Sequence, residues 1–266
     1  MDSKRCGKTG WGGMEISGER SKQIKYLVVI PTMTAIFLAG LALVAGEREQ
    51  GRGAPNTERF DMQVREDFFS AFAGDQQALE RGMKKCEEAL AKDPKNAEAL
   101  VWHGSGLSYS AKKAFMSGDV ERGRQIQAQG VKEMNDAVAL RPDDVTVLIP
   151  RASIFLSAAL HVPSPEVAKR DFQIAADDYE KTLRIQAPAF SRLPIHARGE
   201  LLGGLAEAWN GLGETEKARS YLSRIVQELP NTAYAQRAKK LLEAPLKSGA
   251  LETTCLGCHR QSEMFE

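Results

Sequence analysis

From Thr57 to Ala244, apolar residues recur at three-to-four spacing, and almost no stretch alternates with a period of two. This pattern predicts a fold made of α-helices without strands. Turn signals that contain Gly or Pro divide the region into helices; they lie at residues 74–75, 93–94, 118–119, 142, 163–165, 213–214 and 230. The sequence therefore predicts an all-α domain over residues 57–244.

The clearest structural unit runs from Leu202 to Pro230. Ala206 and Ala218 are small residues placed where two antiparallel helices approach each other, and Gly213 turns the chain between them. Larger apolar residues fill the space between the helices: Leu202, Leu205, Trp209, Leu222 and Ile225. This spacing resembles the tetratricopeptide repeat at every one of its spaced positions. The resemblance implies an α-solenoid of stacked helical hairpins.

Other segments fit the same scheme less closely. We expect an opening helix from Glu58 to Ala73, a second ending at Asp93-Pro94, and later helices over 145–160 and 165–185. The hairpin that turns at Gly118 has about seven extra residues on each side, which predicts a lengthened pair. Pro150 should bend its helix or mark the first turn. With a capping helix around Tyr234 to Leu242, the total is about four hairpins plus a cap.

The family resemblance also implies a groove, lined by the first helix of each pair, that binds peptides or partner proteins. The candidate groove residues are Trp102, His103, Tyr109, Lys113, Arg151, Arg198 and Asn210. The alternative for each is an ordinary solvated or half-buried helix face. A single sequence leaves both interpretations open.

Residues 26–46 form an apolar, uncharged segment of the length needed to cross a bilayer. The preceding residues 1–25 are basic, which places the N-terminus in the cytoplasm and exports the rest of the chain. We expect a single-pass anchor in a bacterial inner membrane, followed by a linker over 47–56, with most of the chain in the periplasm. A cleaved signal ending at Gly46 is the alternative.

Composition and charge exclude several functions. The formal net charge is +1, which argues against nucleic acid as a partner because nucleic-acid binding needs a basic surface. The chain contains no Gly-rich phosphate loop, H-E-x-x-H or G-x-S-x-G motif. The paired acids Asp143-Asp144 and Asp177-Asp178 fit helix starts and helix surfaces. We therefore predict no enzyme activity beyond what a cofactor would supply.

The last residues contain the most specific motif, a C-x-x-C-H run formed by Cys255, Cys258 and His259. Two thiols at this spacing can form thioether links to one haem, and the adjacent imidazole can bind the iron. The motif matches the c-type cytochromes, although the helical domain that surrounds the haem in that family is absent from the tail 245–266. A zinc site or a redox-active thiol pair is the alternative.

The second axial ligand of such a haem is left open by the sequence. Met264 is the nearest sulfur, but it must pass around the porphyrin edge to reach the iron. His103, His161 or His196 of the helical domain could bind instead, as could a partner's residue or water. We predict a membrane-anchored periplasmic scaffold with one covalent haem c that couples protein binding to electron transfer. The alternative is an interaction protein whose C-x-x-C-H motif binds zinc or performs thiol chemistry.

Overall fold

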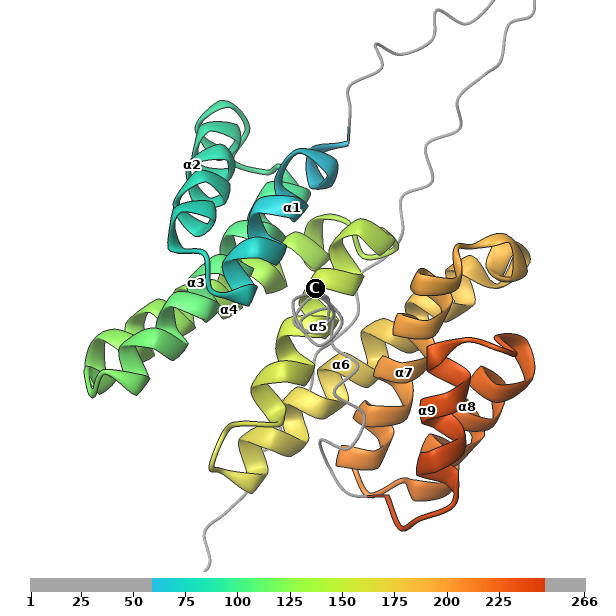
Figure 1. Cartoon of the computed structure of the whole chain (residues 1–266). Helices are drawn as coiled ribbons and strands as arrows, with labels where there is room; N and C mark the ends of the chain where they lie inside the picture. Colours follow the sequence, from blue (N-terminus) through green and yellow to red (C-terminus); the bar gives the residue numbers. More distant parts are fainter. Residues whose placement is uncertain (1–58, 247–266) are drawn as a thin grey trace, which may run out of the picture. The chain divides into compact units, whose positions relative to one another are not determined.

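A computed structural model describes residues 59–246, and this part of the chain is helical, with no strand (Figure 1). The all-α prediction is therefore confirmed for the described residues. The α-helices are α1 (Phe60–Ala73), α2 (Gln76–Lys92), α3 (Ala97–Met116), α4 (Val120–Leu140), α5 (Val145–Ala159), α6 (Pro165–Gln186), α7 (Ile195–Gly211), α8 (Thr215–Glu228) and α9 (Ala233–Leu242). A 3-10 helix, η1 (Ala187–Arg192), follows α6.

Consecutive helices pack as hairpins. The pairs α1 with α2, α3 with α4, α5 with α6, and α7 with α8 are in contact, and α9 packs on α8. Successive hairpins are joined in two ways. The first helices of successive hairpins contact each other: α1 with α3, α3 with α5, and α5 with α7. The second helices α2, α4 and α6 each contact the first helix of the next hairpin. This is the order expected of four stacked hairpins and one further helix.

The turns and helix starts follow from local residues. Gly118 and Gly213 adopt φ of 85° and 82°, a left-handed conformation that favours glycine, and each ends a first helix as predicted. The hydroxyl oxygen of Ser164 accepts a hydrogen bond of 3.3 Å from the backbone nitrogen of Val167, so Ser164 caps α6. Asp or Asn side chains cap four more helices: Asp75, Asn96, Asp119 and Asp144.

The first helix is held by aromatic packing. Phe68 of α1 is fully buried, and its ring stacks on that of Trp102 from α3 with centroids 5.3 Å apart. The ring of Phe72, also in α1, packs on that of Tyr109 in α3, with centroids 5.4 Å apart. Gly106 leaves room for Phe68, because a Cβ there would lie 2.8 Å from its ring. The regularly spaced phenylalanines of α1 thus bind it to α3.

The hairpin of α3 and α4 is the longer counterpart of α7 and α8. Its helices contain 20 and 21 residues, against 17 and 14. Two glycines bring its backbones together. A Cβ on Gly104 would lie 2.6 Å from the carbonyl oxygen of Gly130, and a Cβ on Gly130 would lie 2.7 Å from that of Gly104. The lengthened hairpin therefore depends on a close helix crossing.

Gly130→Ala is expected to lower the free energy of unfolding by about 1–3 kcal/mol, because the added methyl group must push two backbones apart. Urea denaturation of the full-length chain in detergent, monitored by circular dichroism, measures this change in the free energy of unfolding. Gly123→Ala in the same helix is the matched control. The three atoms nearest to its methyl group would all belong to the ring of Phe115, a side chain that is 40% exposed, whereas at Gly130 the nearest atom belongs to the backbone. Equal denaturation midpoints for the two variants would contradict the crossing.

Two local features differ from the sequence prediction or go beyond it. Pro150 lies in the second turn of a continuous α5, not in its first turn. Because proline has no N–H, the carbonyl of Thr146 loses its usual helical donor there. The 3-10 helix η1 was not predicted. It continues the chain directly from the end of α6 and contains Pro188 at one of its first positions.

Candidate functional site

The predicted haem-attachment residues lie outside the described residues, as does the apolar segment 26–46. This applies to Cys255, Cys258, His259 and Met264. Within residues 59–246, no helix is both long and apolar enough to span a bilayer. The same part of the chain has no group of three or more His, Cys, Asp or Glu side chains suited to a metal ion.

Cys86 is the cysteine of the helical domain. It is fully buried on α2, and burial raises the pKa of its thiol well above the ordinary range. A thiol that stays protonated is a poor nucleophile and a poor metal ligand. Cys86 is thus a small core residue of α2.

The three histidines of the domain occupy different environments. His103 is 8% exposed, with Nδ1 2.6 Å from an oxygen of Glu133 and Nε2 3.9 Å from one of Glu87, so both nitrogens face carboxylates. His161 is exposed, and its Nδ1 lies 2.7 Å from the carbonyl oxygen of Ser157. His196 is also exposed and uses Nδ1 in a side-chain hydrogen bond described below. Among the described residues, neither His161 nor His196 has a hydrogen-bond partner at Nε2.

Most predicted groove residues on α3 lie in helix–helix contacts. Trp102 is 6% exposed under α1, and His103 lies between α2 and α4. Tyr109 is half-buried against Phe72, whereas Lys113 is exposed and bonds to Gln76 of α2. Trp102 and His103 therefore stabilise the fold and are not available to a partner in this structure.

Arg151 of α5 is also structural. Its Nε and Nη2 donate to the two carboxylate oxygens of Asp178 at 2.7 and 2.8 Å, and Nη1 donates to Asn135 at 3.0 Å. Burial raises the pKa of Asp178, and the opposing effect of Arg151 leaves it still above its usual range. The two remaining groove candidates, Arg198 and Asn210, lie half-buried on α7.

A second polar group joins α6, α7 and α8. One oxygen of Glu180 accepts hydrogen bonds from Tyr221 Oη at 2.7 Å, Lys217 Nζ at 2.9 Å and Trp209 Nε1 at 3.2 Å. The Lys217 ammonium also lies 3.4 Å from the centre of the Trp209 ring. Burial raises the pKa of Glu180, but these donors outweigh it and bring the pKa below the usual range.

Acidification is expected to weaken this group. The pKa of Glu180 is lower in the folded chain than in the unfolded one, so its stabilisation is complete above the unfolded value. That stabilisation is lost as the pH falls below the unfolded value and through the folded one. Urea denaturation between about pH 5 and pH 3 should therefore show a shallower loss of stability in Glu180→Gln than in the wild type. Parallel pH profiles would contradict this role of Glu180.

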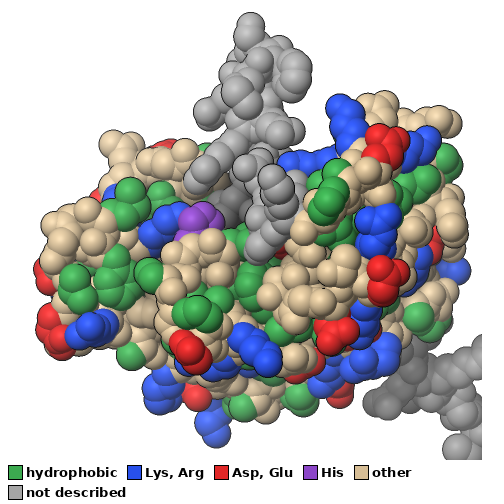
Figure 2. Space-filling view, turned by 90° about the horizontal axis from the view of Figure 1, so that it is seen from below, with side chains coloured by type: hydrophobic (Ala, Val, Ile, Leu, Met, Phe, Trp, Pro, Cys, Tyr) green, Lys and Arg blue, Asp and Glu red, His purple; other side chains and the backbone are tan. Residues whose placement is uncertain are grey.

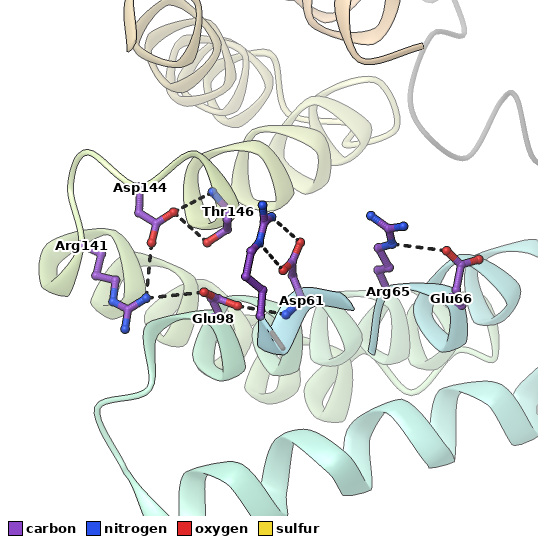
Figure 3. A network of polar contacts seen from close by, with 8 residues as sticks. Asp61, Arg65, Glu66, Glu98, Arg141, Asp144 and Thr146 are labelled. Carbon is purple, nitrogen blue, oxygen red and sulfur yellow. Dashed lines mark hydrogen bonds and ion pairs between the residues drawn. The ribbon is translucent and has the colours of Figure 1, made fainter. Parts of the chain in front are cut away.

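A third polar network surrounds the first described residues (Figure 3). Arg59 pairs with Asp61 at 2.7 and 2.9 Å, and the backbone nitrogen of Asp61 donates to Glu98 at 2.9 Å. Arg141 bridges Glu98 at 3.5 Å and Asp144 at 3.3 Å. Each acid thus has a structural partner, and the network ties the start of α1 to α3 and to the turn before α5.

The surface offers a hollow and an apolar tip. The hollow, of about 400 Å³, is lined by Leu183, Arg184, Ala187, Phe190, Ser191 and Arg224. Arg224 is already engaged there by Glu228 at 2.8 Å. At the end of the α3–α4 hairpin, Phe115, Met116 and Val120 are 40%, 79% and 45% exposed. On the face seen in Figure 2, Lys and Arg side chains stand among Asp and Glu, without a broad basic field.

His196 belongs to a hydrogen-bonded group that the sequence analysis did not recognise. Its Nδ1 lies 2.9 Å from the hydroxyl oxygen of Tyr234 in α9, and that hydroxyl donates to Glu200 at 2.9 Å. His196 and Glu200 are four residues apart on one face of α7. The spacing of His196, Gly199 and Glu200 was visible in the sequence. Their partner, 34 residues beyond Glu200, was not.

Comparison with known proteins adds no assignment, since no protein-family model, curated protein or solved structure matches this chain. The arguments for function therefore rest on the residues themselves. The features that bear on function are the C-x-x-C-H motif, the stacked hairpins and the exposed side chains of the helical domain.

Proposed function

We propose that this protein is a membrane-anchored periplasmic scaffold of the tetratricopeptide type that carries one covalent haem c, and that it couples protein binding to electron transfer. The observation that carries the proposal is the C-x-x-C-H motif at Cys255, Cys258 and His259. The apolar segment 26–46 supports it, because an exported tail lies where covalent haem attachment is expected in bacteria.

The packing of the last hairpin supports the repeat assignment. The small residues Ala206 and Ala218 and the larger Leu202, Leu205 and Leu222 are all fully buried. These are five of the positions on which the resemblance rests, and each has the burial that the repeat requires. Stacked hairpins in this family bind proteins, so we assign the helical domain a partner-binding role. The exposed tip of Phe115, Met116 and Val120 is an apolar contact surface available for that role.

The donor set fits a haem. Cys255 and Cys258 would hold the porphyrin through thioether links, and His259 would bind the iron. His161 and His196 of the helical domain carry exposed imidazoles, either of which could supply a further ligand to the iron. When bound, a haem supplies one-electron redox chemistry.

Haem staining after denaturing electrophoresis tests the proposal. The full-length chain, produced with a working haem-ligation system, should give a stained band that survives denaturation. Cys255→Ala/Cys258→Ala should abolish the band without lowering the amount of protein, and Cys86→Ala is the matched cysteine control. An unstained wild-type band would overturn the proposal. Stoichiometric zinc or a titratable dithiol in that unstained protein would establish the alternative.

A further inference from the structure

We propose that the hollow between α6, η1 and α8 binds a small carboxylate whose body is aromatic or otherwise apolar. The residues that line the hollow all belong to the described helical domain, so the site is independent of the haem and of the residues that would attach it. The geometry that points to it is the presence, in one cavity, of two arginines with unused donors and an aromatic wall.

The hollow has the size and the lining of a small-molecule site. Its volume of about 400 Å³ falls in the range of about 300–1,000 Å³ that is typical of such sites. Three of its side chains supply apolar surface: Leu183, Ala187 and Phe190. Three others supply hydrogen-bond donors: Arg184, Ser191 and Arg224. The hollow opens to solvent, so a ligand can reach these donors directly.

Arg224 of α8 is held in place but keeps unused donors. Its Nε donates to Glu228 at 2.8 Å, and its guanidinium lies 5.6 Å from the ring centre of Phe190. The same guanidinium lies 6.0 Å from the ring centre of Tyr221. Within residues 59–246, the two terminal nitrogens of Arg224 have no hydrogen-bond partner. Since a guanidinium has five N–H donors, most of them remain available to a ligand.

Arg184 of α6 adds a second positive charge that no acid neutralises. Its side chain is exposed and makes no hydrogen bond or ion pair with another described residue. Burial and the bond to Glu180 raise the pKa of the Tyr221 hydroxyl. The charges of Arg224 and Arg184 both oppose that rise, which places both guanidiniums near Tyr221. Among the described residues, Glu228 is the acid paired with either arginine, so the hollow keeps an excess of positive charge.

These features favour a carboxylate attached to an apolar group. The planar fork of a guanidinium matches the two oxygens of a carboxylate, which accepts hydrogen bonds and donates none. Glu180, a nearby acid of the protein, is already paired with Lys217 at 2.9 Å and does not fill this role. Phe190 and Leu183 offer contact to the apolar body of a ligand, which an inorganic anion lacks.

Isothermal titration calorimetry of the full-length protein in detergent tests the inference. The probe is naphthoate, and a titration of naphthoate into detergent alone is subtracted. At neutral pH, naphthoate should bind at one site per chain. Naphthamide has the same body but no charge, so it should bind about 10-fold more weakly or less tightly still, because it lacks the charge-assisted hydrogen bonds. Acetate lacks the apolar body and should give no measurable binding.

Substitutions in the hollow should weaken this binding selectively. Arg184→Gln and Arg224→Gln should each weaken the binding of naphthoate by about 10-fold, because each removes a charged donor. Arg192→Gln is the matched control, since Arg192 is an exposed residue of η1 that does not line the hollow. Its affinity should stay within about 2-fold of wild type, because an exposed charge without direct contact contributes little.

Three results would overturn the inference. They are a wild type that does not bind naphthoate, equal affinities for naphthoate and naphthamide, and variants Arg184→Gln and Arg224→Gln that bind as tightly as wild type. Tighter binding of naphthyl phosphate than of naphthoate would overturn the assignment of a carboxylate. Cys255→Ala/Cys258→Ala should bind naphthoate as the wild type does, which separates this site from the haem. Circular dichroism of each variant checks that the helical domain is folded.

Discussion

Replacing Arg151 by Met is expected to lower the free energy of unfolding by about 3–5 kcal/mol, among the largest effects of any substitution in the helical domain. The Arg151 and Asp178 side chains are only 15% and 5% exposed, and they form two charge-assisted hydrogen bonds. Removal of the arginine leaves a buried carboxylate between α5 and α6 without its counter-charge. Urea denaturation of the full-length protein measures the loss.

A second substitution distinguishes an orphaned charge from lost packing. Arg151→Met/Asp178→Leu should recover most of the stability, because a buried ion pair replaced by apolar side chains is often neutral or stabilising. Lys132→Met breaks the exposed pair with Asp136 and serves as the control, with no measurable loss of stability expected. A double variant as unstable as Arg151→Met would contradict the explanation.

The pH dependence of Arg151→Met gives an independent reading. The pKa of Asp178 is already raised by burial, and loss of Arg151 should raise it further. A raised folded pKa costs stability at high pH, and that cost disappears below the unfolded value near about pH 4. The deficit of the variant relative to wild type should therefore shrink on acidification.

Phe68→Ala is expected to cost about 3–5 kcal/mol, because it creates a cavity where α1, α2 and α3 meet. Phe68 is fully buried, stacks on Trp102, and is approached closely at Gly82 and Gly106. The surrounding backbone is therefore poorly able to collapse into the space. Urea denaturation measures the change.

Phe115→Ala is the matched control for Phe68→Ala, since its ring is 40% exposed at the tip of the α3–α4 hairpin. Its expected effect is within about 0.5 kcal/mol. Similar losses in the two variants would show that the contact of α1 with α3 contributes little to stability.

The helices were predictable where local residues dictate the backbone. Gly118 and Gly213 mark turns because few other residues adopt positive φ, and Ser164 before Pro165 starts a helix for the reasons the sequence predicted. Pro150 was harder to place, because a long apolar helix such as α5 tolerates the loss of one hydrogen bond. The pattern likewise contained no signal separating η1 from α6.

The groove residues show why surface and interior are difficult to tell apart in a repeat. Trp102 and His103 lie on a first helix, where the sequence pattern left them free for a groove. The first helix α1 covers Trp102, and Glu133 of α4 pairs with His103. The contact of Trp102 depends on how neighbouring hairpins stack, and that of His103 on the register of α3 against α4; a periodicity within one helix specifies neither.

The hydrogen-bonded groups of His196 and Glu180 were not predictable for a related reason. Each joins side chains from different helices, and their register depends on packing. Tyr221 is 41 residues from Glu180, and Tyr234 is 38 residues from His196. Only Gly199 hinted at such a contact, since glycine inside a helix often marks a close approach.

The most direct test of the central claim is a pyridine haemochrome spectrum of the purified full-length chain, combined with its intact mass. The account predicts one haem per chain, both vinyl groups converted to thioethers, and a mass increased by one haem after denaturation. The Cys255→Ala/Cys258→Ala variant should show neither the haemochrome spectrum nor the added mass. A chain whose mass equals that of the polypeptide alone, without a haemochrome spectrum, would contradict the account.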